Sequence, residues 1–255
     1  MPRYFLEVAY KGTRYRGFQI QNNANTIQSE VERALQIIVG EKIELTGSSR
    51  TDAGVHAHQN FFHFDLSPVE KAGKIDSSKH LYKLNAVLPA DIVVKNILKM
   101  PPAAHCRFDA ISREYKYFIY RSKDPFLNDR AFYFPYRLNI DLMQEAAAII
   151  LEYKDFSSFS KRNTQVKTFI CSVEKSQWLQ SGNTVVYNIT ANRFLRGMVR
   201  GLVATMLKVG REKTTIKKFG EIIEARDCTL ASFSAPAQGL FLISVNYPSG
   251  YFDGV

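Results

Sequence analysis

Cysteine, tryptophan and long apolar runs are all scarce in this sequence. No stretch approaches the roughly eighteen consecutive apolar residues of a membrane-spanning helix, so neither a span of that kind nor a membrane partner is expected. The three cysteines, Cys106, Cys171 and Cys228, are far apart and include no C-x-x-C pair. This excludes a disulfide framework and a zinc site of that spacing, and favours reduced, buried thiols. The first residues lead directly into a strand pattern without the apolar core of a signal peptide, so we expect a cytoplasmic location.

Acidic residues are also in the minority. The chain of 255 residues has 34 Lys and Arg against 24 Asp and Glu, a net charge of +10. Its hydrophobic fraction of 45% is that of a folded protein rather than a disordered one. The excess of positive charge favours a polyanionic partner such as nucleic acid. Charge alone does not identify a function, because many basic proteins bind RNA weakly and without specificity.

The first hundred residues contain two helix patterns among four strand patterns. Residues 3–10 alternate as a strand, and Ile27, Val31, Leu35 and Ile38 form a helical stripe. This helix has Asn25 or Thr26 as its N-cap and Gly40 as its stop. Strand patterns at 42–46, 59–66 and 91–99, and a helical pattern near 79–87, complete the order β-α-β-β-α-β.

A similar order starts again near residue 112. Residues 113–120 alternate as a strand, and residues 140–151 have a helical face. The patterns that follow are a hairpin of residues 166–179 and 184–190 around Ser181-Gly182-Asn183, a helical side from Leu195 to Met206, and a strand at 240–247.

Together these patterns predict an α+β fold with internal duplication. Its two halves are ferredoxin-like, or split βαβ, and are joined into a mostly antiparallel central sheet with helices packed on it. Met100-Pro101-Pro102 is the predicted boundary, because adjacent prolines stop both strands and helices. The chain would thus divide into residues 1–102 and residues 103–255.

The loop from Gly47 to Ala57 lies between two of these strand patterns and is the first candidate site. Its small residues allow a ligand to approach the backbone closely, and Asp52 offers a single carboxylate. The local pattern fits two interpretations. Asp52 either makes an Asx-turn beside Gly54 or carries chemistry.

This loop resembles the motif that carries the catalytic aspartate in the TruA family of tRNA pseudouridine synthases. Six further motifs appear in the order of that family, and together they cover about residues 4 to 247. Two positions depart from its pattern: Phe18 stands where the family usually has Trp, and Ser49 stands where a glycine commonly precedes the arginine. The six motifs are Tyr10-Lys11-Gly12 with Gly17-Phe18-Gln19-Ile20-Gln21; Leu84-Asn85-Ala86-Val87-Leu88-Pro89 with Asp91-Ile92; Arg107-Phe108 with Arg113-Glu114-Tyr115-Lys116-Tyr117; Asp155-Phe156-Ser157-Ser158-Phe159; Phe194 with Met198-Val199-Arg200; and Gly239-Leu240-Phe241-Leu242.

The resemblance implies the pseudouridine synthase fold and the isomerisation of uridine to pseudouridine in the anticodon stem-loop of tRNA, at tRNA positions 38–40. The reaction needs no metal and no small-molecule cofactor, and its one required carboxylate would be Asp52. Whether this group attacks C1′, adds to C6 of the base or removes a sugar proton stays open. The resemblance also implies a homodimer, with each tRNA touching both subunits.

Other residues take their roles from the same resemblance. Arg200 would keep Asp52 ionised through an ion pair. The N-terminal half would carry the aspartate loop, and the C-terminal half would carry the pocket residues Tyr115, Arg200 and Leu240. Arg193, Arg196 and Arg200 recur at three and four residues, which on pattern alone predicts a solvated basic face of a helix. Tyr115 and Leu240, otherwise a strand residue and a core residue, would hold the two faces of uracil. The expected substrate-binding residues are therefore Tyr115, Leu240, Arg50 and Thr51.

The target nucleotide must leave its stack, at a cost of a few kcal/mol that phosphate contacts must offset. Each basic candidate for these contacts could equally be an ordinary surface charge. The principal candidates are Lys11, Arg14, Arg16, Lys161, Arg162, Arg193 and Arg196, followed by Lys167, Lys208, Arg211, Lys213, Lys217 and Lys218.

Two alternatives belong to other classes of function. A non-catalytic RNA-binding protein with ferredoxin-like sheets fits the charge equally well, although residues 111–121 lack a convincing RNP1 string. A metal-dependent hydrolase would use His56, His58 and His63, since His56-x-His58 places two imidazoles on one side of an extended segment. No acidic or thiol ligand with suitable spacing accompanies them, so polar packing is preferred and no metal site is predicted.

Overall fold

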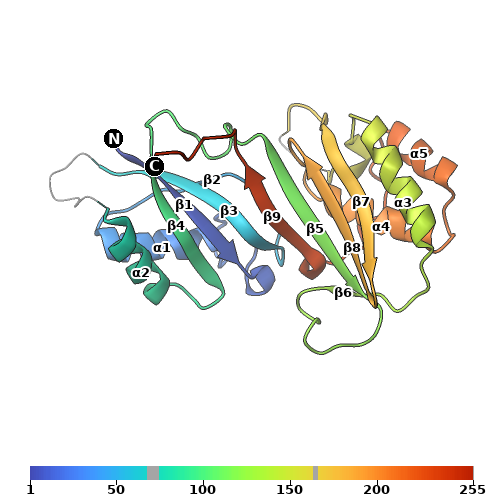
Figure 1. Cartoon of the computed structure of the whole chain (residues 1–255), viewed down its shortest axis with the longest axis horizontal. Coiled ribbons are helices and arrows are strands. Elements are labelled where there is room, and N and C mark those ends of the chain that lie inside the picture. Colours follow the sequence, from blue (N-terminus) through green and yellow to red (C-terminus); the bar gives the residue numbers. More distant parts are fainter. Residues whose placement is uncertain (68–74, 163–165, 255) are drawn as a thin grey trace. The chain divides into compact units, whose positions relative to one another are not determined.

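The computed structural model describes residues 1–67, 75–162 and 166–254. It has a mixed α+β fold with a large, mostly antiparallel sheet, which confirms the predicted fold class. Two compact units make up the chain: the first contains Met1–Ile111 and Leu242–Val255, and the second contains Ser112–Phe241 (Figure 1). The division at residues 102 and 103 stays a prediction. None of the helices in the described residues is both long enough and apolar enough to cross a membrane.

The first unit follows the predicted order β-α-β-β-α-β. Its central strands pair antiparallel in the order β4-β1-β3, and the short β2 pairs with β3. The predicted strand at 42–46 is reduced to the two residues of β2. The elements are β1 (Arg3–Tyr10), a 3-10 turn η1 (Gly12–Arg14), α1 (Ile27–Val39), β2 (Thr46–Gly47), β3 (His56–Asp65), α2 (Ser77–Val87) and β4 (Ile92–Met100).

Helix α1 shows how local chemistry sets an element's limits. The Thr26 hydroxyl accepts a hydrogen bond from the Ser29 amide, and Ser29 in turn caps Thr26, which forms a capping box. Gly40 ends the helix in the left-handed region, with φ of 81°. The predicted stripe is buried at Ile27, Val31 and Leu35. Both predicted ends of this helix are confirmed, with Thr26 rather than Asn25 as the N-cap.

The second unit pairs its strands in the order β5-β8-β7, with β6 parallel to β5. The hairpin predicted around Gly182 is confirmed: this glycine has φ of 55° and joins β7 to β8. The elements are β5 (Ser112–Tyr120), β6 (Phe132–Tyr133), α3 (Ile140–Ile149), 3-10 turns η2 (Ile150–Glu152) and η3 (Ser157–Phe159), β7 (Val173–Ser181), β8 (Thr184–Ala191), α4 (Met198–Gly210), α5 (Ile216–Glu224), and η4 (Ala237–Gly239), followed by β9 (Leu240–Asn246), which continues into the first unit.

The starts of two elements in this unit differ from expectation by three residues or more, and helix α5 was not expected at all. Strand β7 begins at Val173 rather than 166, and α4 begins at Met198 rather than 195. Gly197 causes the second difference, because its φ of 78° is left-handed and the helix can start only after it. Helix α5, capped by Thr215, buries Phe219, Ile222 and Ile223. Their spacing of three and one was the signal that could have revealed it.

Candidate active site

Asp52 lies on the loop between β2 and β3, at the first position of a tight turn. The Val55 amide donates to the Asp52 carbonyl over 3.2 Å. Gly54 has φ of 79°, a conformation that glycine adopts without strain. The Asp52 side chain is half-buried, whereas Thr51 before it is buried. The turn therefore holds the carboxylate at the border between the core and solvent.

A buried polar network supports this loop from beneath. Asn60 on β3, which is fully buried, donates to the Ser49 carbonyl over 3.0 Å and to the Tyr10 hydroxyl over 3.1 Å, and its side-chain oxygen accepts from the Ser48 hydroxyl over 2.7 Å. The hydroxyls of Tyr10 and Thr51 are 2.9 Å apart. Burial raises the pKa of Tyr10 to about 12, so it stays a neutral hydrogen-bonding group. Sequence reasoning missed Asn60; an amide directly before the apolar pair Phe61-Phe62 was the signal.

Two glycines of the N-terminal motif touch the same loop. A Cβ on Gly12 would lie 2.0 Å from the Val55 carbonyl oxygen. Gly17 has φ of 108°, and a Cβ there would lie 3.3 Å from the Thr51 carbonyl oxygen. The neighbouring Phe18 amide donates to that carbonyl over 3.1 Å. The backbone of residues 12–18 thus packs directly against the aspartate loop, and only glycine fits at positions 12 and 17. We call this segment the glycine wall.

The two departures from the family pattern both fit this structure. Phe18 is 1% exposed and stacks on Phe62, with ring centroids 4.6 Å apart. Its ring also abuts Gly47, where a Cβ would lie 2.2 Å from it. Phe18 therefore supplies a packed aromatic plate behind the loop. Ser49 is not among the described residues with positive φ, so its backbone does not require glycine.

In the second unit, Arg200 sits in the first turn of α4. Its Nε donates to the Ala235 carbonyl over 2.7 Å, and the Tyr117 hydroxyl donates to the next carbonyl, that of Pro236, over 2.7 Å. Burial raises the pKa of Tyr117, and the nearby Arg200 opposes that rise. These two bonds fix the segment that leads into Leu240, the first residue of β9.

Tyr115 and Leu240 also belong to the second unit, and both are largely buried at 8% and 7% exposed. Tyr115, on β5, meets Phe194 edge to face, with ring centroids 5.0 Å apart. Asp52, Arg50 and Thr51 belong to the first unit. The ion pair between Asp52 and Arg200 stays a prediction.

The predicted basic helical face of Arg193, Arg196 and Arg200 is wrong. Arg193 and Arg196 precede Gly197 and lie in the loop before α4, so only Arg200 is helical. The loop instead meets another predicted basic residue: the Lys161 amide donates to the Arg196 carbonyl over 2.9 Å. Arg162 follows Lys161 and is exposed. Four predicted RNA-binding residues thus come from two neighbouring loops of the second unit.

The basic residues after β1 lie on and beside η1 in the first unit. Arg14 forms an exposed ion pair with Asp91 at 2.8 Å, and Tyr15 donates to the same carboxylate over 2.6 Å. Exposed pairs of this kind contribute little stability, so Arg14 can exchange Asp91 for another anion. Lys11 and Arg16 are both exposed. All three side chains are placed where a polyanion can reach them.

The two histidines of the His56-x-His58 pattern differ in burial. His56 is buried, and its Nδ1 accepts from the Gly12 amide over 3.1 Å, whereas His58 is exposed. The register of β3 against β1 shifts between Val8 and Tyr10, which pair with Asn60 and Ala57, so β3 has an irregularity next to His58. His56 therefore joins the glycine wall to β3.

His63, His105 and Cys106 form a group that offers three possible metal ligands within 4.8 Å of one another. The His63 Nδ1 and the Cys106 Sγ are 3.1 Å apart, and the Cys106 thiol also donates to the Thr46 carbonyl over 3.2 Å. The His105 Nδ1 accepts from the amides of Arg107 and Phe108. Burial lowers the pKa of His63 to about 4, with help from His105 and Arg3. These hydrogen bonds use the Nδ1 atom of each histidine and link the group to the edge of β2 through the Thr46 carbonyl.

The mixed α+β fold and the comparisons that follow place this chain in the class of pseudouridine synthases, which are isomerases. The family model described as tRNA pseudouridine synthase matches residues 7–109 and 150–248. A protein of Parabacteroides distasonis named tRNA pseudouridine synthase A is 44% identical, covering 99% of this chain and 98% of its own. Proteins of the same name from Porphyromonas gingivalis and Staphylococcus aureus are 44% and 34% identical, covering 99% and 94% of this chain and 100% and 90% of their own. The chain belongs to the tRNA pseudouridine synthase family.

Proposed function

We propose that this protein isomerises uridine to pseudouridine in the anticodon stem-loop of tRNA, at tRNA positions 38–40, with Asp52 as the catalytic carboxylate. The observation that supports this assignment most directly is the bracing of the Asp52 loop. Backbone contacts from Gly12 and Gly17 hold it on one side, and the Asn60 network holds it on another. A carboxylate held in this way needs little reorganisation when it meets a substrate.

The chemistry is an isomerisation without net redox change. The bond between C1′ and N1 of uracil breaks, the base turns, a bond forms between C1′ and C5, the proton on C5 is lost to solvent, and N1 takes up a proton in its place. Asp52 acts on the nucleoside in its ionised form, by attack on C1′, by addition to C6 or by removal of a sugar proton. Arg200 stabilises that ionised form through an ion pair. Tyr115 and Leu240 hold the two faces of the uracil while it turns.

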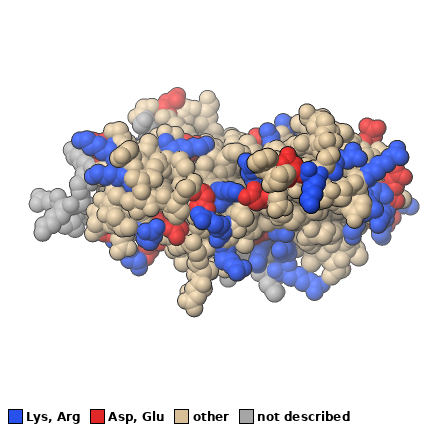
Figure 2. All heavy atoms as spheres, turned by 90° about the horizontal axis from the view of Figure 1, so that it is seen from below, with Lys and Arg blue, Asp and Glu red and all other residues tan. Residues whose placement is uncertain are grey.

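Phosphate contacts support the extrusion of the target nucleotide. Lys and Arg side chains predominate over Asp and Glu on the face drawn in Figure 2. We assign these contacts to exposed and half-buried basic residues of both units, which bind the backbone without reading sequence. The assigned residues are Lys11, Arg14, Arg16, Lys161, Arg162, Arg193 and Arg196.

The protein acts in the cytoplasm as a homodimer, with tRNA as its partner and no small-molecule cofactor. Light scattering during gel filtration tests the dimer, since a monomeric mass at micromolar concentration would contradict it.

The decisive experiment compares the wild type with Asp52→Asn on tRNA labelled with tritium at C5 of uridine. Wild type releases tritium and Asp52→Asn does not, while both bind tRNA with similar affinity. The isosteric amide leaves the loop's packing intact, so lost turnover reports the missing charge. Release by Asp52→Asn would reject the catalytic assignment. Tight tRNA binding without release by the wild type would instead indicate a non-catalytic RNA-binding protein.

A further inference from the structure

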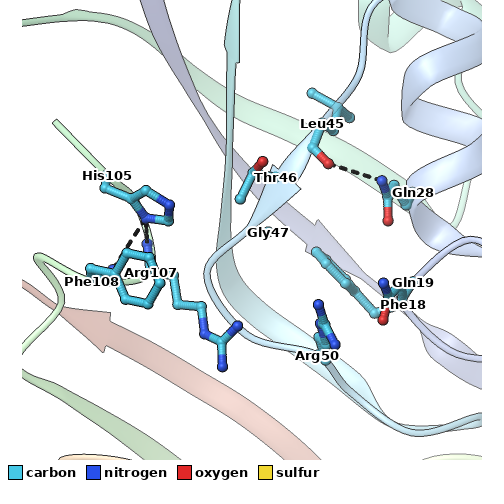
Figure 3. A pocket seen from close by; sticks show the side chains of 10 residues that line it. All are labelled: Phe18, Gln19, Gln28, Leu45, Thr46, Gly47, Arg50, His105, Arg107 and Phe108. Carbon is cyan, nitrogen blue, oxygen red and sulfur yellow. Dashed lines mark hydrogen bonds between the residues drawn. The ribbon is translucent and has the colours of Figure 1, made fainter. Parts of the chain in front are cut away.

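A cavity of about 310 Å³ opens in the first unit, next to the aspartate loop (Figure 3). Arg50, two residues before Asp52, lines it together with Thr46 of β2 and the Phe18 ring. Segment 105–108 forms the opposite side. The volume lies at the small end of the range for ligand-binding pockets, so it suits a single small group of the size of a nucleotide.

The cavity has a positive lining. Two arginines, Arg50 and Arg107, face it, and no carboxylate is among its lining residues. Figure 3 shows both guanidinium groups at the same end of the cavity. Arg50 is exposed and makes no ion pair within the described ranges. Two guanidinium groups in one lining favour an anionic ligand, and they suit phosphate in particular.

The lining also includes a solvent-exposed aromatic ring. Phe108 is 74% exposed, an unusual state for a phenylalanine, and the Arg107 guanidinium lies 5.7 Å from its centroid. The His105 ring lies beside it, with centroids 4.2 Å apart. The His105 Nδ1 accepts from the amides of Arg107 and Phe108, over 3.1 and 3.3 Å. These hydrogen bonds hold the turn in a conformation that keeps the Phe108 ring exposed. An exposed aromatic ring of this kind can stack against a base.

We propose that this cavity is a second nucleotide subsite, which binds a nucleotide flanking the target uridine in the same RNA. Its base stacks on Phe108, and its phosphate contacts Arg50 and Arg107. The proposal rests on the proposed function, because it requires an RNA strand that enters the Asp52 loop. Gln19, exposed at the cavity and without a side-chain hydrogen bond to the described residues, is placed to contact the edge of the base.

The test is a double-mutant cycle in which the protein change is Phe108→Ala and the RNA change is the removal of one base from a stem-loop. Each stem-loop carries a single abasic nucleotide at one position flanking the target uridine, and Kd is measured in the Asp52→Asn background so that no RNA is modified. Stacking of a base on an aromatic ring predicts about a tenfold loss of affinity for Phe108→Ala on intact RNA. At one flanking position, the abasic RNA should bind the protein that has Phe108 with about the same tenfold lower affinity than intact RNA does. The same abasic RNA should bind Phe108→Ala no more weakly than intact RNA does.

The matched control is Tyr82→Ala, which removes an aromatic ring of 78% exposure from α2 of the same unit. It should bind every RNA as the parent protein does. The subsite would be overturned if the affinity losses from Phe108→Ala and from the missing base were additive at every abasic position, or if Phe108→Ala left Kd unchanged. Tritium release by the protein with Asp52 intact is measured separately. A coupled cycle without any tritium release would reject the proposed function and still support the subsite.

Discussion

Replacing Gly12 by alanine should displace the aspartate loop. The added Cβ would lie 2.0 Å from the Val55 carbonyl oxygen and 2.7 Å from its carbon, whereas real Cβ contacts stay above 3.0 Å. Both partners are backbone, so neither can rotate away, and the two segments must separate by about 1 Å. Val55 closes the turn of Asp52 through its amide, so this movement reaches the carboxylate.

The expected cost has two parts. Overpacking at a buried site destabilises a protein by about 1–3 kcal/mol. A misplacement of about 1 Å in a catalytic group lowers turnover by about 100-fold. The hydrogen bond from the Gly12 amide to His56, 3.1 Å long, should weaken as well. Gly12→Ala should therefore fold with a lower Tm and lose about two orders of magnitude in kcat.

The assay is single-turnover tritium release from labelled tRNA, combined with thermal unfolding. Gly220→Ala is the control, because Gly220 lies inside α5 and its Cβ would meet only the Tyr153 hydroxyl at 3.6 Å. Alanine in that helix should leave activity unchanged and raise stability by up to about 1 kcal/mol. If Gly12→Ala kept both the Tm and the turnover of the wild type, the glycine wall would have no role in placing Asp52.

Three further outcomes follow from the same contacts. Asn60→Ala should lose about 2–3 kcal/mol of unfolding free energy in urea titrations and most of its turnover, since buried hydroxyls lose their partner; unchanged stability would contradict the role of the network. Arg200→Ala should nearly abolish tritium release, whereas Arg200→Lys should recover part of it because the charge persists; equal rates in all forms would remove Arg200 from the mechanism. His63 has a folded pKa of about 4, below its ordinary value of 6.5, so the unfolded chain binds more protons and stability falls as pH decreases from 6.5 towards 4. Between pH 7 and pH 4.5, the free energy of unfolding should fall by about 1–2 kcal/mol less in His63→Gln than in the wild type; the figure is discounted because solvent screens part of the pKa shift. Identical profiles of stability against pH would exclude His63 as the titrating group.

Local signals in the sequence predicted much of the fold. The ends of α1 follow from Thr26 and Gly40, which act on their own turns, and the β7–β8 hairpin follows from Gly182. The seven motifs led to the family because each consists of short strings of residues close together in the sequence. One error came where a single backbone angle outweighed a pattern, since the left-handed φ of Gly197 delays the start of α4.

The aspartate loop could be located in the sequence, but its support could not. Tyr10 meets Thr51 across 41 positions of the chain, and Asn60 meets Tyr10 across 50. His63 likewise meets Cys106 across 43 positions. Periodicity and capping report contacts within a few residues, whereas these partners are chosen by strand pairing and by the irregular register of β3. The candidate residues for the chemistry could therefore be predicted from the sequence, whereas how they are held depended on which distant segments the sheet brought into contact.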